Sequence, residues 1–162
     1  MAPTSLTHPQ LGVIRATSPK ANVWTTEPLP IGAFGYLASI EAWTDGGEPS
    51  PQQIAAMVSI HQATPEFREM VAGYMRDQYM QWERPAYRKQ IGDARYTQTL
   101  KEPDLPEIAE PSEIWKLITG ILTVIIDERA DLSLEFITTF DKSHNFAVRF
   151  RDGELYEVMM DG

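Results

Sequence analysis

The sequence predicts an α+β protein, in which two main helices pack on one face of an antiparallel sheet. Two observations carry this prediction. The C-terminal quarter, residues 119–160, alternates apolar and polar residues in a pattern typical of half-buried strands. The middle of the chain, residues 50–82, instead repeats apolar residues at helical spacing. Because helices and strands occupy separate runs of the chain, they are expected to segregate within the fold.

The C-terminal quarter is expected to form a four-strand meander. A dense apolar run at residues 119–127 predicts a central strand that is covered on both faces. Residues 132–140, 146–151 and 156–160 then repeat with period two, which predicts three further strands. These strands are short and antiparallel, because only tight turns separate them.

The last hairpin allows two registers. A two-residue loop made of Asp152 and Gly153 would place Val148 opposite Glu157. A three-residue loop that also takes in the preceding arginine, with its glycine left-handed, would place Val148 opposite Tyr156. The second register keeps nearly all apolar side chains on one face, so the longer, bulged loop is predicted.

The N-terminal segment, residues 1–26, is rich in Pro, Ser and Thr and predicts an arm, with a short edge strand possible at residues 10–15. Residues 27–162 are expected to form a single α+β domain, since a chain of 162 residues suits about one domain. Within this domain, residues 36–43 alternate and predict a strand.

Two helix starts are visible. Ser50 is a capping residue, Pro51 suits the first helical position, and Gln53 can close a capping box. Thr64 and Pro65 start a second helix in the same way. An apolar stripe follows along this helix, made of Phe67, Met70, Val71, Tyr74, Met75, Gln78 and Trp82.

The end of the second helix is unusually rich in aromatic and methionine side chains. Tyr79 falls off the inward line of the stripe, and Pro85 must disturb the helix. Such residues are enriched at protein interfaces, so Tyr79 and Trp82 are candidate anchors for a partner. A wide core-facing surface is the alternative interpretation.

Composition excludes several classes of function. The chain carries a net charge of −9, which disfavours binding to nucleic acid and favours a basic protein partner. It has no cysteine, so disulfides and thiol catalysis are absent. No apolar run long enough to span a membrane and no secretory signal are visible, so a cytoplasmic location is expected. The pattern sets no oligomeric state.

The acidic segment, residues 101–113, concentrates this charge. It contains five acids and one lysine. Asp104, Glu107 and Glu110 are candidate contacts for a basic partner, because complementary charge raises the rate of association. A solvated loop without a partner is the alternative.

Catalytic and metal-binding patterns are weak. His144 lies close to Asp141 and Ser143, but residues this close in sequence seldom align as a triad. Asp127 and its acidic neighbours resemble a solvated turn more than a cation site, and no metal-binding or phosphate-binding motif occurs. No cofactor is therefore expected.

Three stretches carry a resemblance to a known kind of protein. Residues 146–158 (FAVRFRDGELYEV), residues 135–141 (EFITTFD) and residues 50–54 (SPQQI) resemble a family of small bacterial α+β domains of uncharacterised function, similar to the immunity proteins found beside secreted polymorphic toxins. The resemblance implies an intracellular protein that binds and blocks one toxin of its own lineage, by occluding the toxin's active site.

The leading hypothesis is therefore a non-catalytic immunity protein whose contacts include Asp104, Glu107, Glu110, Tyr79 and Trp82. One alternative is a small hydrolase or metal-dependent enzyme that uses Asp141, His144 and acids near Asp127. Another is a phage or housekeeping interaction module without a toxin partner.

Overall fold

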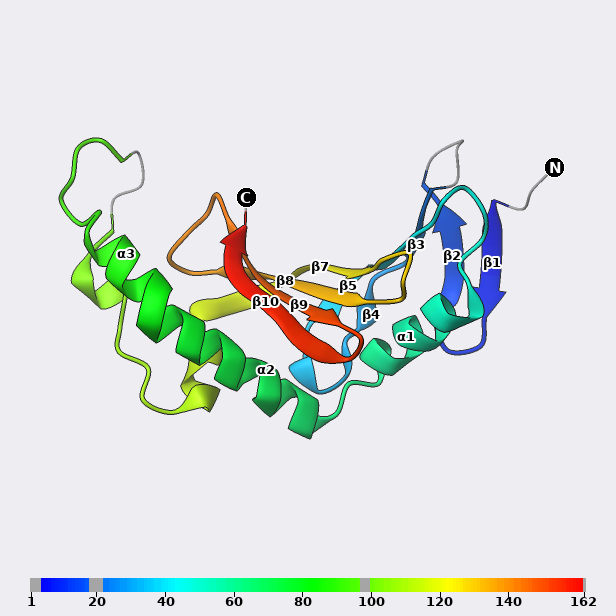
Figure 1. The fold of residues 1–162 in the computed structure, drawn as a ribbon, viewed down its shortest axis with the longest axis horizontal. Helices are drawn as coiled ribbons and strands as arrows, with labels where there is room; N and C mark the ends of the chain where they lie inside the picture. Colours follow the sequence, from blue (N-terminus) through cyan, green and yellow to red (C-terminus); the bar gives the residue numbers. More distant parts are fainter. Residues whose placement is uncertain (1–3, 18–21, 97–99, 162) are drawn as a thin grey trace.

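The computed structural model describes residues 4–17, 22–96 and 100–161, and its main feature is an eight-stranded sheet (Figure 1). The strand order is β1-β2-β3-β6-β7-β8-β9-β10, and all neighbours are antiparallel except the parallel pair β6–β7. The bounds are β1 (Ser5–His8), β2 (Gly12–Ala16), β3 (Val23–Thr26), β6 (Ile40–Trp43), β7 (Ile118–Ile126), β8 (Leu132–Thr138), β9 (Asn145–Arg151) and β10 (Glu154–Asp161). The four-strand meander β7–β10 and the α+β class are as predicted.

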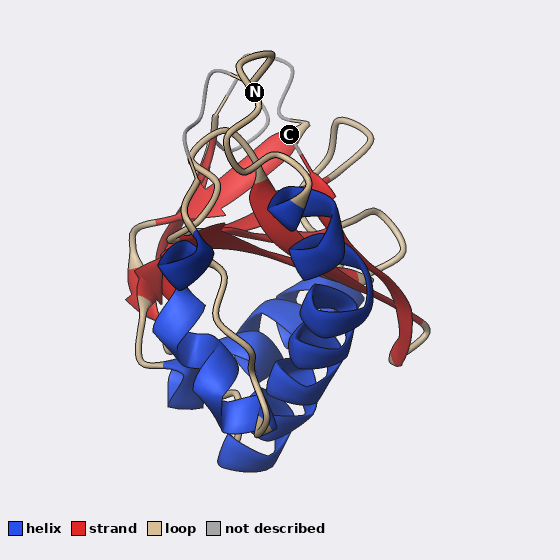
Figure 2. Ribbon diagram, turned by 90° about the vertical axis from the view of Figure 1, so that its left-hand side faces the viewer, coloured by secondary structure: helices blue, strands red, loops and turns tan. Residues whose placement is uncertain are grey.

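The helices form a second layer on one face of this sheet, as Figure 2 shows. The two long helices are α1 (Pro51–His61) and α2 (Pro65–Gln78), and a short α3 (Arg84–Arg88) follows. The capping box predicted for α1 is present, because Ser50 and Gln53 each accept a hydrogen bond from the backbone N–H of the other residue.

The buried amide of Gln53 also ties α1 to the sheet. Its Nε2 donates to the carbonyl oxygens of Trp43 and Asp127, both at 2.8 Å. These carbonyls lie at the ends of the parallel strands β6 and β7, so one side chain joins the start of the helical layer to the centre of the sheet.

Pro85 disturbs the end of α2 as predicted. Residues Tyr79–Glu83 form a π-helical turn, η2, before α3 begins. Proline lacks the N–H that would continue the α-helical hydrogen bonding, and a π turn is a common way to accommodate such a fault. Further along, a 3₁₀ helix, η4 (Pro111–Leu117), precedes the meander.

The helical layer packs on the sheet through aromatic side chains. Phe67 and Tyr74 of α2 contact Phe150 of β9, with ring centroids 5.5 and 6.5 Å apart. Phe34, from the 3₁₀ helix η1 (Gly32–Phe34), meets Phe67 and Trp115. The predicted packing of the second main helix on one face of the sheet is therefore confirmed for these residues.

The N-terminal segment differs from the predicted arm. Its described residues form β1, β2 and β3, which extend the sheet at one edge. Leu11, Ile14 and Trp24 are almost completely buried, and this burial holds the segment in place. The prediction failed because these apolar residues are too widely spaced, between turns, to give a periodic signal.

Two central strands also differ from prediction. The strand predicted at residues 36–43 divides into β5 (Leu37–Ala38), which pairs with β4 (Leu29–Pro30), and β6. Strand β7 is central but is covered on one face only, since Leu122 is 51% exposed. The strand bulges at Leu122, and this irregularity interrupts the alternation of inward and outward residues. The dense apolar run therefore does not indicate burial on both faces.

The predicted register of the last hairpin is wrong. Asp152 and Gly153, with φ of 53° and 79°, form a two-residue turn, and the bulge lies further along at Leu155–Glu157. This bulge restores the alignment of apolar residues and places Val148 opposite Val158. It also places Arg149 opposite Glu157 on the other face of the sheet.

Candidate functional site

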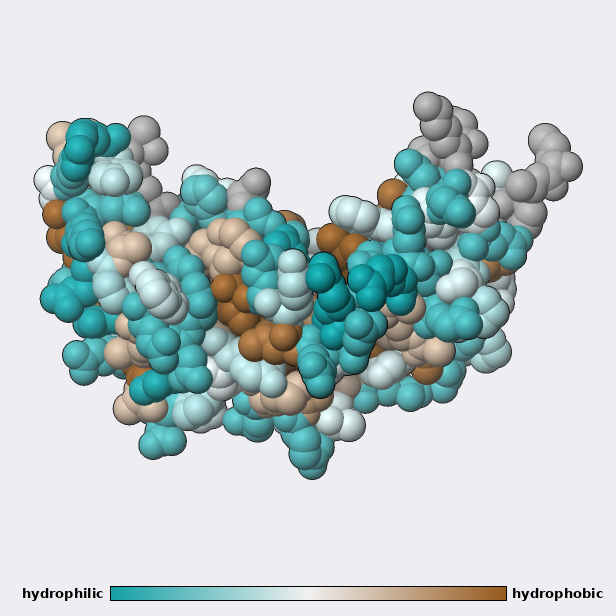
Figure 3. Space-filling view, in the orientation of Figure 1, coloured by the Kyte–Doolittle hydropathy of each residue, from teal (hydrophilic) through white to brown (hydrophobic). Residues whose placement is uncertain are grey.

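Among the described residues, no helix covers the face of the sheet opposite the helical layer (Figure 2), and the outline of the molecule is hollowed on this side (Figure 3). We call it the open face. Five ionised side chains from four strands meet there, and we call them the acidic network: Glu41, Glu135, Arg149, Glu157 and Asp161.

Arg149 is the centre of the acidic network. Its guanidinium donates to Glu157 Oε2 at 2.9 Å and to the Asp161 carboxylate, and it lies 3.9 Å from Glu135. Glu41 joins from β6, where its carboxylate accepts a hydrogen bond from the Thr123 hydroxyl at 3.3 Å. One cation thus pairs with three carboxylates, and with Glu41 the acidic network has three negative charges in excess.

The crowding of charge in the acidic network shifts the pKa values of Glu135 and Arg149. Burial, together with the charges of Asp161 and Glu41, raises the pKa of Glu135, and Arg149 only partly offsets this. Burial opposes ionisation of Arg149, but its hydrogen bonds to Glu157 and Asp161 raise its pKa overall. The open face therefore holds concentrated negative charge that a further cation would stabilise.

Apolar side chains flank this charge. Ile137 of β8 lies between the buried Phe136 and Thr138 and is 38% exposed, and Leu122 lies on the neighbouring strand. Trp43, two residues after Glu41 on β6, is 44% exposed. Exposed apolar residues beside fixed charges are a common composition for a protein-binding surface.

The acidic segment lies elsewhere, against the helical layer. Its backbone is fixed by arginines: Arg76 Nε donates to the Ile108 carbonyl at 2.9 Å, and Arg84 Nε donates to the Leu105 carbonyl at 2.8 Å. Leu105 and Ile108 are buried. The predicted contact residues Asp104, Glu107 and Glu110 are all exposed, and they lie before, between and after these two buried residues.

Tyr79 was predicted as an anchor for a partner, and this prediction is wrong. Its side chain is completely buried, and its hydroxyl donates to the Pro106 carbonyl at 2.8 Å. Burial, partly offset by Arg84, raises its pKa to about 12. Tyr79 lies four residues after the buried Met75 and eight after the buried Val71, so ordinary helical spacing directs it inward, where it holds the acidic segment. Trp82 is 66% exposed and remains available.

The residues of the predicted hydrolase come together only in part. Asp141 is buried, and its Oδ2 accepts hydrogen bonds from the Tyr87 hydroxyl and from His144 Nδ1, the latter at 2.9 Å. Burial alone would raise the pKa of Asp141, but the hydrogen bonds from Tyr87, the Ser143 N–H and His144 hold it below its usual value. This geometry closes the β8–β9 loop.

Asp127 does not join this cluster. It lies in the β7–β8 turn, whereas Asp141 lies beyond the other end of β8. The seven residues of β8 separate them by roughly 20 Å. Asp127 Oδ1 instead accepts the backbone N–H groups of Arg129 and Asp131. Within the described ranges, no three potential ligand side chains are grouped to hold a metal ion.

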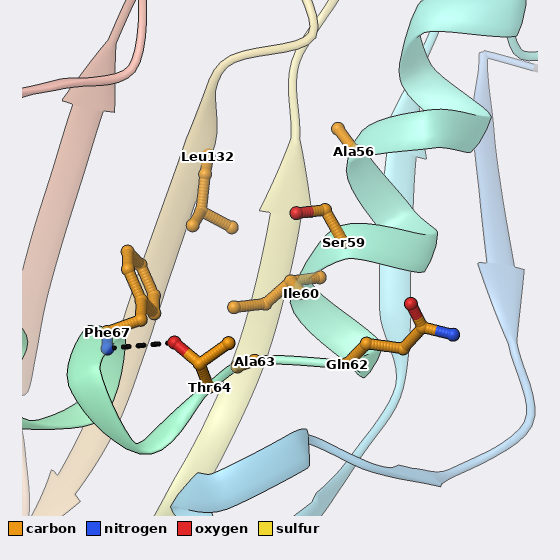
Figure 4. Close-up of a pocket in the computed structure, with 8 residues that line it drawn as sticks. All are labelled: Ala56, Ser59, Ile60, Gln62, Ala63, Thr64, Phe67 and Leu132. Atoms are coloured by element: carbon orange, nitrogen blue, oxygen red, sulfur yellow. Dashed lines mark hydrogen bonds between the residues drawn. The ribbon is translucent and has the colours of Figure 1, made fainter.

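A shallow pocket of about 410 Å³ opens on the helical side, between α1, α2 and β8 (Figure 4). Its floor is apolar, with Ile60, Ala63, Phe67 and Leu132, and its rim carries the polar side chains of Ser59, Gln62 and Thr64. Thr64 Oγ1 is occupied as the cap of α2. The pocket therefore offers shape and apolar surface but no reactive group.

The fold and the open face together define an α+β protein with an acidic, partly apolar sheet surface. The chain belongs to the DUF6985 family, a domain of unknown function, whose sequence profile matches residues 13–161. This match includes β2 and β3, which the sequence had suggested were part of an arm. No curated protein and no solved structure matches the chain. Among the described residues, no helix has the length and apolar character needed to cross a membrane.

The acidic network was missed by sequence reasoning, although part of its signal was present. Glu135 and Arg149 fall at the outward positions of strands whose alternation was recognised. The wrong hairpin register hid the pairing of Arg149 with Glu157. Glu41 reaches the network because β6 pairs in parallel with β7, and no local sequence pattern predicts this pairing.

Proposed function

We propose that this protein is a non-catalytic bacterial immunity protein that binds one basic protein toxin and blocks its active site. The observation that carries the proposal is the open face, where three carboxylates share one guanidinium beside a fourth carboxylate and exposed apolar side chains. The resemblance of three sequence stretches to immunity proteins supports the same kind of partner.

The open face is the main contact surface in this proposal. Charges that are partly buried and held by their neighbours need little reordering when a partner docks, so less free energy is lost on binding. Complementary charge also speeds association and selects against acidic proteins. The exposed Asp104, Glu107 and Glu110 lie on a different side of the sheet and act mainly through long-range attraction.

An interaction module without a toxin partner, of phage or housekeeping origin, would use the same surface. The identity of the neighbouring gene separates these two proposals, since immunity proteins are encoded beside their toxins. The enzyme alternative lacks its assembled site, because Asp127 and Asp141 lie at opposite ends of β8.

The test is association and rescue. The product of the neighbouring gene is expressed alone and with this protein, and cell survival is measured together with complex formation by the purified proteins. The proposal expects toxicity that this protein relieves, and a stable complex. The absence of a complex, or toxicity that persists although the protein is expressed, would contradict it.

A further inference from the structure

The outer edge of β10 is a feature to which the proposed use of the open face assigns no role. Strand β10 ends the eight-stranded sheet, and within the described residues no other strand pairs with its free side. It spans eight residues, whereas β1 at the opposite edge spans four. A long free edge offers a row of backbone N–H and C=O groups to an added strand, and proteins usually block such edges.

The side chains of β10 divide cleanly between the two faces. Glu157, Met159 and Asp161 pair with outward residues of β9 on the open face. Val158 and Met160 pair with buried residues of β9 on the helical face and are only half-buried themselves. A strand added beside β10 would therefore meet two acids on one face and apolar residues on the other.

The surface beside this edge is suited to such a strand. Figure 3 shows an apolar patch on the near side of the molecule, between the places where Figure 1 draws β10 and α2. The apolar side chains of an added strand would cover this patch. A bulge at Leu155–Glu157 disturbs the start of β10, so the usable edge is the second half of the strand.

The charge of β10 indicates which kind of strand can pair with its free edge. Strand β10 contains three acids, Glu154, Glu157 and Asp161, and no basic residue. A second copy of this chain would place acids near acids, and like charges on adjacent strands are destabilising. A basic strand would instead add cations to a network that has three carboxylates in excess of its arginine.

We infer that β10 recruits an extended strand of the basic partner, with basic residues at its first and fifth positions facing Glu157 and Asp161 and apolar residues between them facing Val158 and Met160. The spacing follows from period two, because residues four apart on a strand share a face. This inference rests on the proposed function and specifies how the partner is held.

The probe is the capped peptide Thr-Lys-Val-Thr-Val-Lys-Thr, titrated into the isotope-labelled full-length protein while backbone amide shifts are recorded. The inference expects shifts concentrated in β9 and β10. Replacing both lysines of the peptide with glutamate should weaken binding by about tenfold or more. The Glu157→Gln protein should also bind more weakly, and the Glu107→Gln protein should bind like the wild type.

Two backbone-methylated peptides make the test specific for strand addition. One carries N-methyl groups on its valines and the other on its lysines and central threonine. Only one of these sets of N–H groups can face β10, so one methylated peptide should lose binding and the other should keep it. Equal behaviour of both peptides, or shifts located away from β10, would overturn the inference.

The same spectra distinguish the remaining outcomes. Shifts of the β10 amides on simple dilution of the protein would show that a second copy occupies the edge, and would also overturn the inference. If the neighbouring gene product binds and is neutralised while the peptide leaves β10 unchanged, the proposed function stands and the edge inference fails. If that product does not bind at all, the proposed function itself fails.

Discussion

The acidic network and the acidic segment hold comparable charge in opposite ways. In the acidic segment, arginines bond to backbone carbonyls and to Glu102 at one end, whereas the carboxylates of Asp104, Glu107 and Glu110 are exposed. In the acidic network, Arg149 bonds to the carboxylates themselves, and burial raises the pKa of Glu135. The difference shows that acidity along a sequence does not reveal how strongly charges are held and desolvated, because that depends on the neighbours that the fold supplies.

Arg149→Met should give the largest effect of the single changes. Removing the shared cation leaves three half-buried carboxylates without their partner and should lower the free energy of unfolding by about 2–4 kcal/mol. Denaturant unfolding measures this. The control is Arg95→Met, which removes a surface ion pair with Asp93 and should leave the free energy of unfolding almost unchanged. Similar losses in both variants would show that the network contributes no more than a surface pair.

Tyr79→Phe tests how the acidic segment is fixed. The substitution removes the hydrogen bond to Pro106 and leaves a carbonyl without its partner, so stability should fall by about 1–2 kcal/mol. Hydrogen exchange at Leu105 and Ile108 should rise in parallel. The exposed Tyr96 provides the matched control, and Tyr96→Phe should leave both readouts unchanged.

The two buried carboxyls predict opposite pH dependences. The pKa of Asp141 is lowered on folding from the ordinary 3.8, so its contribution to stability is present above that value and is lost as the pH falls through the folded-state pKa. Asp141→Asn should therefore flatten the loss of stability between about pH 5 and about pH 3.

Glu135 has the opposite sign. Its pKa is raised on folding from the ordinary 4.5, so its contribution is present below that value and is lost as the pH rises through the folded-state pKa. Glu135→Gln should therefore remove a decline in stability above about pH 4.5. Thermal melts at a series of pH values on both sides of these two ordinary pKa values measure how stability changes with pH in each variant. The same pH dependence in Asp141→Asn and Glu135→Gln would contradict the opposite pKa shifts of the two carboxyls.

Glu107→Gln should give the smallest effect. The side chain is exposed in the acidic segment, so unfolding free energy should change by less than about 0.5 kcal/mol. A loss above about 1 kcal/mol would mean that this segment, like the acidic network, depends on its carboxylates.

Local patterns predicted the elements that local physics determines. The capping residues Ser50 and Thr64 mark both long helices, and strict alternation marks β8 and β9. The burial of Leu11 and Trp24, which fixes the N-terminal strands, depends instead on contacts with distant residues. The inward direction of Tyr79 follows from ordinary helical spacing, because it lies four residues after the buried Met75, so the prediction that it falls off the stripe was wrong.

The candidate site was harder to predict than the fold. The acids of the segment at residues 101–113 are adjacent in sequence and easy to see, whereas Glu41 and Asp161 are separated by most of the chain. They share the open face only because β6 pairs in parallel with β7 and the meander then continues to β10. Strand order of this kind is a property of the whole sheet and not of any window of sequence.

The most direct test compares two pairs of substitutions that remove equal charge. Glu41→Gln with Glu157→Gln alters the open face, and Glu107→Gln with Glu110→Gln alters the acidic segment. Binding of the neighbouring gene product is measured by calorimetry for both proteins, after thermal melts confirm that each is folded. The open-face pair should raise Kd by about tenfold or more, and the segment pair by less than about threefold. A larger loss of binding in the segment pair would contradict the assignment of the open face as the contact surface.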